Sequence, residues 1–134
     1  MADPDLAVPG TEKIRRDGPP VAIAARYVAA DPEILGCPVK RRAAVVLSLL
    51  AANRDPAAFE DLHAFRIRGG RRDHVLFGGG IHACLGAPLT RLEIEATLRT
   101  LLSLHPRTPI AAPAARGQPT IGFVSLRELR LSLT

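Results

Sequence analysis

The sequence predicts a mainly α-helical chain with a small β component. Residues 85–104 hold one long helical pattern, while short β-compatible segments separated by turns occupy much of the rest. Twelve Pro and eleven Gly imply irregular backbone between these elements. The 134 residues fit one small domain, but four Phe, one Tyr and no Trp supply few large anchors for a core. We therefore expect the chain to be part of a larger unit.

The amino-terminal part is expected to contain a helix end followed by short strands. Residues 1–10 are expected to be disordered, and residues 11–15 predict the end of a helix that an Asp-Gly-Pro-Pro turn terminates. Residues 21–27 are β-compatible, and residues 33–36 suggest a second strand and a turn. Residues 43–50 form a continuous apolar run, for which periodicity does not decide between a buried strand and the start of a helix.

The middle of the chain predicts a long connection. The Asn-Arg-Asp-Pro sequence at 53–56 indicates a turn or a helix start, and the Arg-rich residues 59–77 show no regular period. Connections of this length are usually functional or held in place by something else. Near the carboxyl end, a loop rich in Pro and Ala follows residue 105, and residues 129–133 alternate like a final strand.

The helix expected at residues 85–104 has two apolar faces. Its apolar side chains form two stripes on nearly opposite sides, with Leu85, Leu89, Leu92 and Ala96 in one and Ile94, Leu98, Leu101 and Leu102 in the other. A surface helix carries one such face, so this helix is expected to have neighbours on both sides. Pro88 falls in the first turn, where its missing N–H costs little, and His105-Pro106 ends the helix.

The formal net charge of +5 is spread over short clusters of Lys and Arg, at residues 40–42 and 66–72. Such a balance would favour an acidic partner surface or a nucleic acid. No aromatic residues interleave with the clusters, however, and no nucleic-acid-binding module is visible. We expect a solvated, arginine-rich surface and no nucleic-acid partner.

The two cysteines, Cys37 and Cys84, lie far apart without a paired pattern. This argues against a disulfide scaffold and for a reducing compartment, and Cys37 is expected to be structural. The amino terminus carries acid where a signal peptide would carry base, and the longest apolar run, residues 43–52, is too short to span a bilayer. We expect a soluble, cytoplasmic protein without a membrane partner.

Residues 77–86, Phe-Gly-Gly-Gly-Ile-His-Ala-Cys-Leu-Gly, place a cysteine where the long helix begins. The glycines let the backbone turn sharply and approach a flat ligand closely. At a helix start, the sulfur of Cys84 faces free N–H groups and the positive end of the helix dipole, which favour thiolate over thiol. A lone cysteine is more often a small buried hydrophobe. A glycine-rich loop that opens a helix also suggests phosphate binding, but the Gly-Lys-Ser/Thr ending of a P-loop is missing.

The stretch from Phe77 to Gly86 resembles, position for position, the cysteine-loop signature of cytochromes P-450, Phe-Gly-x-Gly-x-His-x-Cys-x-Gly. The resemblance implies the carboxy-terminal, proximal-haem portion of the P-450 fold, of the soluble bacterial type, and an O₂-dependent monooxygenase. It also implies haem b (iron protoporphyrin IX), with the Cys84 thiolate as the axial ligand of the iron. In this reading Gly78 and Gly86 line the haem loop, His82 contacts a propionate, and Phe77 packs beneath the ring near the sulfur.

The resemblance extends along nearly the whole chain. Glu12 and Arg15 resemble the family's Glu-x-x-Arg pair, which braces the proximal side of the haem, although alone they would be an ordinary helical ion pair. Arg26 resembles the arginine that binds a haem propionate. The implied segments are the Glu-x-x-Arg helix end and strands at 11–56, the meander at 57–76, the cysteine loop at 77–86, the helix at 85–104, and a loop and terminal hairpin at 105–134. The tip of that hairpin touches substrate in many members.

The sequence departs from the family pattern at several positions. Three cations at 40–42 replace the usual Pro-x-Gly turn, and Leu62 stands where Pro is usual. Ala64 stands where an arginine commonly completes the network with the Glu-x-x-Arg pair, so His63 or Arg66 would have to substitute. The histidines at 63, 74 and 105 have no ligand-like spacing and are expected at the surface or in loops.

Whole members of the family are several times longer, and the part that would precede residue 1 holds the distal helix and most of the substrate pocket. We therefore expect a fragment that is not a competent monooxygenase alone, with no catalytic residue in this chain beyond the haem ligand. For the intact family, a ferredoxin- or flavodoxin-type electron donor and a small organic substrate are expected. The alternative is a truncated, non-catalytic remnant that binds no haem or needs a partner chain.

Overall fold

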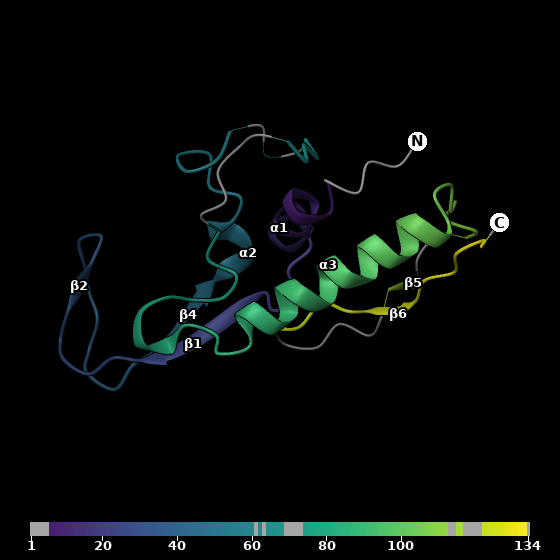
Figure 1. The fold of residues 1–134 in the computed structure, drawn as a ribbon. Coiled ribbons are helices and arrows are strands. Elements are labelled where there is room, and N and C mark those ends of the chain that lie inside the picture. The colour runs from purple at the N-terminus through teal and green to yellow at the C-terminus, as the bar shows by residue number, and fades with distance from the viewer. Residues whose placement is uncertain are drawn as a thin grey trace.

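The computed structural model of the chain describes residues 6–60, 62, 64–68, 74–112, 115–116 and 122–133. Its long helix, α3 (Ala87–Leu104), packs against the amino-terminal helix α1 (Ala7–Asp17), and the described strands form three separate two-stranded sheets (Figure 1). The hairpin of β2 and β3 extends away from the rest of the chain. The expected fold class, mainly helical with a small β component, is confirmed.

Helix α1 corrects the expectation that residues 1–10 are disordered, because residues 7–10 are helical and residues 1–5 lie outside the described part. Pro9 and Gly10 suggest a break, but Pro9 lies in the first turn, where a backbone N–H has no helical partner in any case. The hydroxyl of Thr11 donates to the Ala7 carbonyl at 2.7 Å. The helix ends where the Gly18 N–H donates to the Ile14 carbonyl at 2.9 Å.

The central sheet pairs β1 (Ile23–Tyr27) antiparallel with β4 (Ala44–Ser48). Between them, β2 (Glu33–Ile34) and β3 (Cys37–Pro38) form a hairpin, whose turn places Leu35 and Gly36 at positive φ. The sequence did not decide whether the apolar run at 43–50 is a strand or the start of a helix, and the structure contains both. It is a strand that leads directly into the short helix α2 (Leu49–Ala52), where the Ser48 hydroxyl accepts the Ala51 N–H.

The carboxyl end holds a short hairpin of β5 (Ala115–Arg116) and β6 (Leu126–Glu128), and residues 117–121 between them lie outside the described part. The strand expected at 129–133 is wrong as a regular strand. Within it only Leu131 forms a β-bridge, to Ile110. Two backbone hydrogen bonds flank this bridge, from the Ala111 N–H to the Arg130 carbonyl and from the Ser132 N–H to the Pro109 carbonyl. Alternation predicted an extended backbone correctly, but a ladder also requires a partner strand of equal length.

The buried apolar residues of the described part lie on α1, α2, α3 and the connection between α2 and α3, and they are Ala7, Leu49, Phe59, Leu76 and Ala87. On α3, the stripe that contains Leu89 and Leu92 is exposed, while the opposite stripe at Ile94 and Leu98 is half-buried. The helix therefore has a packed side and an open one.

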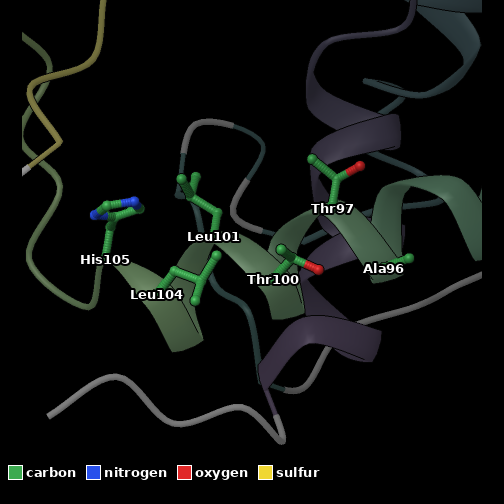
Figure 2. Close-up of a pocket in the computed structure, with 6 residues that line it drawn as sticks. All are labelled: Ala96, Thr97, Thr100, Leu101, Leu104 and His105. Atoms are coloured by element: carbon green, nitrogen blue, oxygen red, sulfur yellow. The ribbon is translucent and has the colours of Figure 1, made fainter.

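A hollow of about 450 Å³ lies on the carboxyl half of α3, lined by Ala96, Thr97, Thr100, Leu101, Leu104 and His105 (Figure 2). Its walls are methyl, methylene and hydroxyl groups of one helix and the residue that follows it. None of the helices in the described part of the chain is long and apolar enough to cross a membrane.

Candidate functional site

Cys84 lies in a tight loop that closes immediately before α3. Its backbone N–H donates to the Phe77 carbonyl at 2.8 Å, and its own carbonyl accepts the Ala87 N–H at 3.2 Å. These bonds fix both sides of the residue while the side chain stays exposed. A Cβ at Gly86 would lie 3.8 Å from Cys84 Sγ, in van der Waals contact, so glycine leaves more space beside the sulfur.

Two glycines set the path of the loop. Gly78 and Gly80 have φ values of +67° and +60°, which residues other than glycine rarely adopt. The 3-10 turn Gly80–His82 begins at the second of them. A Cβ at Gly78 would also lie 3.2 Å from the His82 carbonyl oxygen. Gly79, between them, is extended with φ of −162° and has open space around it.

Gly78→Ala is expected to destabilise the folded chain by about 1–2 kcal/mol, because a left-handed backbone and a close backbone contact both oppose the added methyl. Urea denaturation followed by circular dichroism measures the loss. Gly79→Ala is the matched control and should change stability by less than about 0.5 kcal/mol. Equal effects of the two substitutions would show that the backbone path of the loop does not need glycine at 78.

Apolar side chains flank the sulfur on an open surface. Ile81 and Leu85 are 96% and 97% exposed, and the side chain of His82 is exposed between them in sequence. Large exposed apolar side chains beside a single thiol form a surface that a flat apolar molecule could cover. Among the described residues, no group of three or more His, Cys, Asp and Glu side chains could hold a metal ion by itself.

The carboxylate of Glu12 contacts three side chains, one on its own helix and two from other parts of the chain. It forms an ion pair with Arg15 on the same helix, accepts the Arg91 Nε–H of α3 at 2.9 Å, and lies 2.9 Å from His74 Nε2. Burial alone would raise the pKa of Glu12. The hydrogen bonds from Arg15, Arg91 and His74 outweigh it and lower the pKa from 4.5 to about 2. Glu12 is therefore held as a carboxylate.

The Phe77 ring lies against the cations that Glu12 holds. The guanidinium carbons of Arg15 and Arg91 are 5.0 and 4.8 Å from the ring centroid, within the range of cation–π attraction. The His74 ring is 6.0 Å from the same centroid, tilted by 51°. The structure thus brings Glu12 and Arg15 together with the ring of Phe77, whose carbonyl oxygen in turn bonds Cys84.

Two members of this group were not expected. His74, predicted to be a surface or loop residue, lies in the loop before the cysteine, but its side chain is only 3% exposed and contacts Glu12. Arg91 lies on the helix after the cysteine. His63, one of the two residues expected as a third partner of the pair, lies outside the described residues, whereas His74 and Arg91 both contact Glu12. No local sequence signal marks either residue.

The remaining predicted positions lie on other elements. Arg26 is on β1, where its Nη1 donates to the Ala25 carbonyl at 2.8 Å. Cys37, expected to be structural, is exposed on β3. Other cations of α1 meet aromatic rings of the 59–77 connection, with Arg16 5.0 Å from the Phe59 centroid and Lys13 5.7 Å from that of Phe65. These contacts hold the irregular connection against α1.

The described site thus combines an exposed thiol, in a glycine loop at the start of a helix, with a carboxylate that two arginines and a histidine share. The sequence model of the family Cytochrome P-450 matches residues 16–105, and the chain belongs to this family.

Full-length relatives are similar along most of the chain. It is 37% identical over 127 residues to the biotin biosynthesis cytochrome P-450 of Bacillus subtilis, covering 95% of this chain and 32% of the relative. It is 37% identical over 112 residues to 6-deoxyerythronolide B hydroxylase of Saccharopolyspora erythraea, covering 84% of this chain and 28% of that protein. The chain thus spans about a third of the length of the curated relatives it matches.

The fold agrees with solved structures of the same family. A crystal structure of the cytochrome P-450 BioI, in complex with acyl carrier protein ligated to hexadec-9Z-enoic acid, superposes with a TM-score of 0.92 at 35% identity. The superposition covers 98% of this chain and 34% of that one. The fold class, a part of the cytochrome P-450 fold, is therefore established.

Proposed function

We propose that this chain supplies the haem-ligating part of a cytochrome P-450 monooxygenase, with the Cys84 thiolate as the axial ligand of the iron. The observation that carries the proposal is the exposed sulfur of Cys84, in a loop closed by the Phe77 carbonyl and followed at once by α3. The loop has every specified residue of the P-450 signature.

The side chains around the sulfur fit haem b. The thiolate would bind the iron, and Ile81 and Leu85 are exposed apolar groups beside it. Gly86 leaves the space beside the sulfur free of a side chain, and Gly78 lets the loop fold back on the His82 carbonyl. Arg26 and His82 would hold the propionates, which are anionic groups that a guanidinium and an imidazolium both bind. The haem, when bound, supplies the oxygen chemistry, which a thiolate ligand favours by donating electron density.

The activity proposed for the intact protein is insertion of one oxygen atom from O₂ into a small organic substrate. One relative, 6-deoxyerythronolide B hydroxylase, is named for a reaction of this class, which supports the proposal. An acidic ferredoxin- or flavodoxin-type donor would suit the net positive charge of +5. Both cysteines are free, which fits a reducing compartment such as the cytoplasm.

Reconstitution with haemin tests the proposal. The chain is titrated with haemin, reduced with dithionite and exposed to carbon monoxide, and a strongly red-shifted Soret band of thiolate-ligated haem is expected. Cys37→Ala, which removes the other exposed thiol, serves as the control and should keep the band. An unshifted band, typical of nitrogen-ligated haem, would contradict the proposal for this chain.

A second candidate is a chain that binds no haem, or does so only when a partner covers α3. The exposure of Leu89, Leu92 and Leu104 along that helix favours it, because single helices seldom leave such a stripe in water. In this case the reconstituted chain shows no red-shifted band alone. The band is then expected only when a polypeptide that carries the remaining P-450 fold is refolded with it.

A further inference from the structure

The Arg91 side chain is the part of the Glu12 group that comes from α3, the helix that follows Cys84. Its Nε–H donates to Glu12 Oε1 at 2.9 Å, while its guanidinium carbon lies 4.8 Å from the Phe77 ring centroid. A planar guanidinium can serve a carboxylate at its edge and an aromatic ring at its face at the same time. One side chain of α3 therefore contacts both α1 and the first residue of the cysteine loop.

Phe77 passes this contact to Cys84. Its ring lies against Arg15 and Arg91, and its carbonyl oxygen accepts the Cys84 N–H at 2.8 Å. The ring and the carbonyl belong to one residue, so a contact that holds the ring also restrains the backbone to which Cys84 is bonded. The route from Glu12 to the sulfur-bearing residue thus consists of contacts between adjacent groups.

The ion pair between Arg91 and Glu12 is expected to add little to the free energy of unfolding. The Arg91 side chain is 45% exposed, and an ion pair in that environment contributes little to folding because water screens it. Arg99, on the same helix, makes the same kind of pair with Glu95 at 2.8 Å and is 44% exposed. The two arginines differ in what else they touch, since only Arg91 has a described contact with an aromatic ring of the loop.

We propose that Arg91 is a positioning residue for Cys84. Its guanidinium, which the Glu12 carboxylate binds, holds the Phe77 ring, and the Phe77 carbonyl in turn bonds the backbone that presents the sulfur. The functional meaning rests on the proposed haem ligation by Cys84, but the positioning itself is a property of the chain without haem. Helix α3 thus contacts the cysteine loop twice, where the helix begins after the loop and through Arg91, which contacts the first residue of the loop.

Hydrogen exchange of the Cys84 amide, measured by NMR on the full chain without haem, tests the positioning directly. Arg91→Gln keeps a polar side chain of similar size but loses the charge and most of the cation–π attraction. We expect the Cys84 amide to exchange about fivefold faster in this variant, as loss of a contact of that kind would produce. Arg99→Gln is the matched control and should leave the Cys84 amide unchanged.

The pattern of exchange decides between positioning and general stability. Faster exchange confined to the cysteine loop, with an unchanged urea midpoint, supports the proposal, and partial recovery in Arg91→Lys supports it further, since lysine keeps the charge without the planar group. Equal effects of Arg91→Gln and Arg99→Gln, or acceleration spread over the whole chain, overturn it. A chain that fails to bind haem removes the proposed function but leaves this result intact, because no haem is present in the measurement.

Discussion

Cys84→Ala is expected to abolish the red-shifted Soret band of the reduced, CO-treated chain completely, because a methyl group cannot ligate iron. The folded chain should tolerate the change well. The Cys84 side chain is exposed, and the bonds that close the loop use its backbone N–H and carbonyl rather than its sulfur. Truncating an exposed side chain changes stability by less than about 0.5 kcal/mol. The measurement is the absorption spectrum together with a urea midpoint.

Cys37 makes the test sharper, because it is the other cysteine and is also exposed. It lies on β3, in the hairpin that extends away from the helices. Cys37→Ala should therefore keep the band at full intensity. A band that survives Cys84→Ala, or that disappears in Cys37→Ala, would assign any bound haem to a different ligand and remove Cys84 from the proposed role.

The cysteine loop and the helix behind it could be predicted because their signals are local. The glycines predicted a sharp turn before Cys84, where Gly78 and Gly80 have positive φ, and the apolar spacing of residues 85–104 predicted the helix observed at Ala87–Leu104. The two apolar stripes also indicated that this helix expects neighbours on two sides. In the structure one stripe is half-buried and the other open.

The group around Glu12 could be predicted only in part. Arg15 lies three residues away on the same helix, a spacing that sequence displays. His74 and Arg91 lie 62 and 79 residues from Glu12, so the chain must fold before either contact exists. Single-sequence patterns carry no record of such pairs, and the sequence therefore assigned His74 no role beyond that of a surface or loop residue. The family resemblance pointed to a third partner from the connection but not to these two residues.

Glu12→Gln is expected to destabilise the chain by about 3 kcal/mol, more than any other single change considered. The variant leaves Arg15, whose side chain is almost fully buried, without its negative partner. It also replaces charged acceptors for Arg91 and His74 by an amide that can accept at only one atom. Urea denaturation at pH 7 measures the loss. Glu95→Gln, which breaks the more exposed pair with Arg99, should cost less than about 1 kcal/mol.

The same carboxylate gives the stability of the chain a defined dependence on pH. The pKa of Glu12 is 4.5 in the unfolded chain and about 2 in the folded chain. Burial raises the pKa, but the hydrogen bonds from Arg15, Arg91 and His74 lower it by more. A depressed pKa stabilises the folded state fully above about pH 4.5 and loses that contribution as pH falls toward 2, a total of about 3 kcal/mol.

Protonation of Glu12 in acid therefore removes the same negative charge from the wild type that Glu12→Gln removes at neutral pH. We expect the difference in unfolding free energy between wild type and Glu12→Gln to be largest at pH 7 and to shrink steadily below pH 4.5. Glu95→Gln should show no comparable convergence with the wild type. A difference that stays constant down to pH 3 would mean that ionised Glu12 does not hold this group together. The Phe77 ring, which rests on the cations that Glu12 binds, would then need another support.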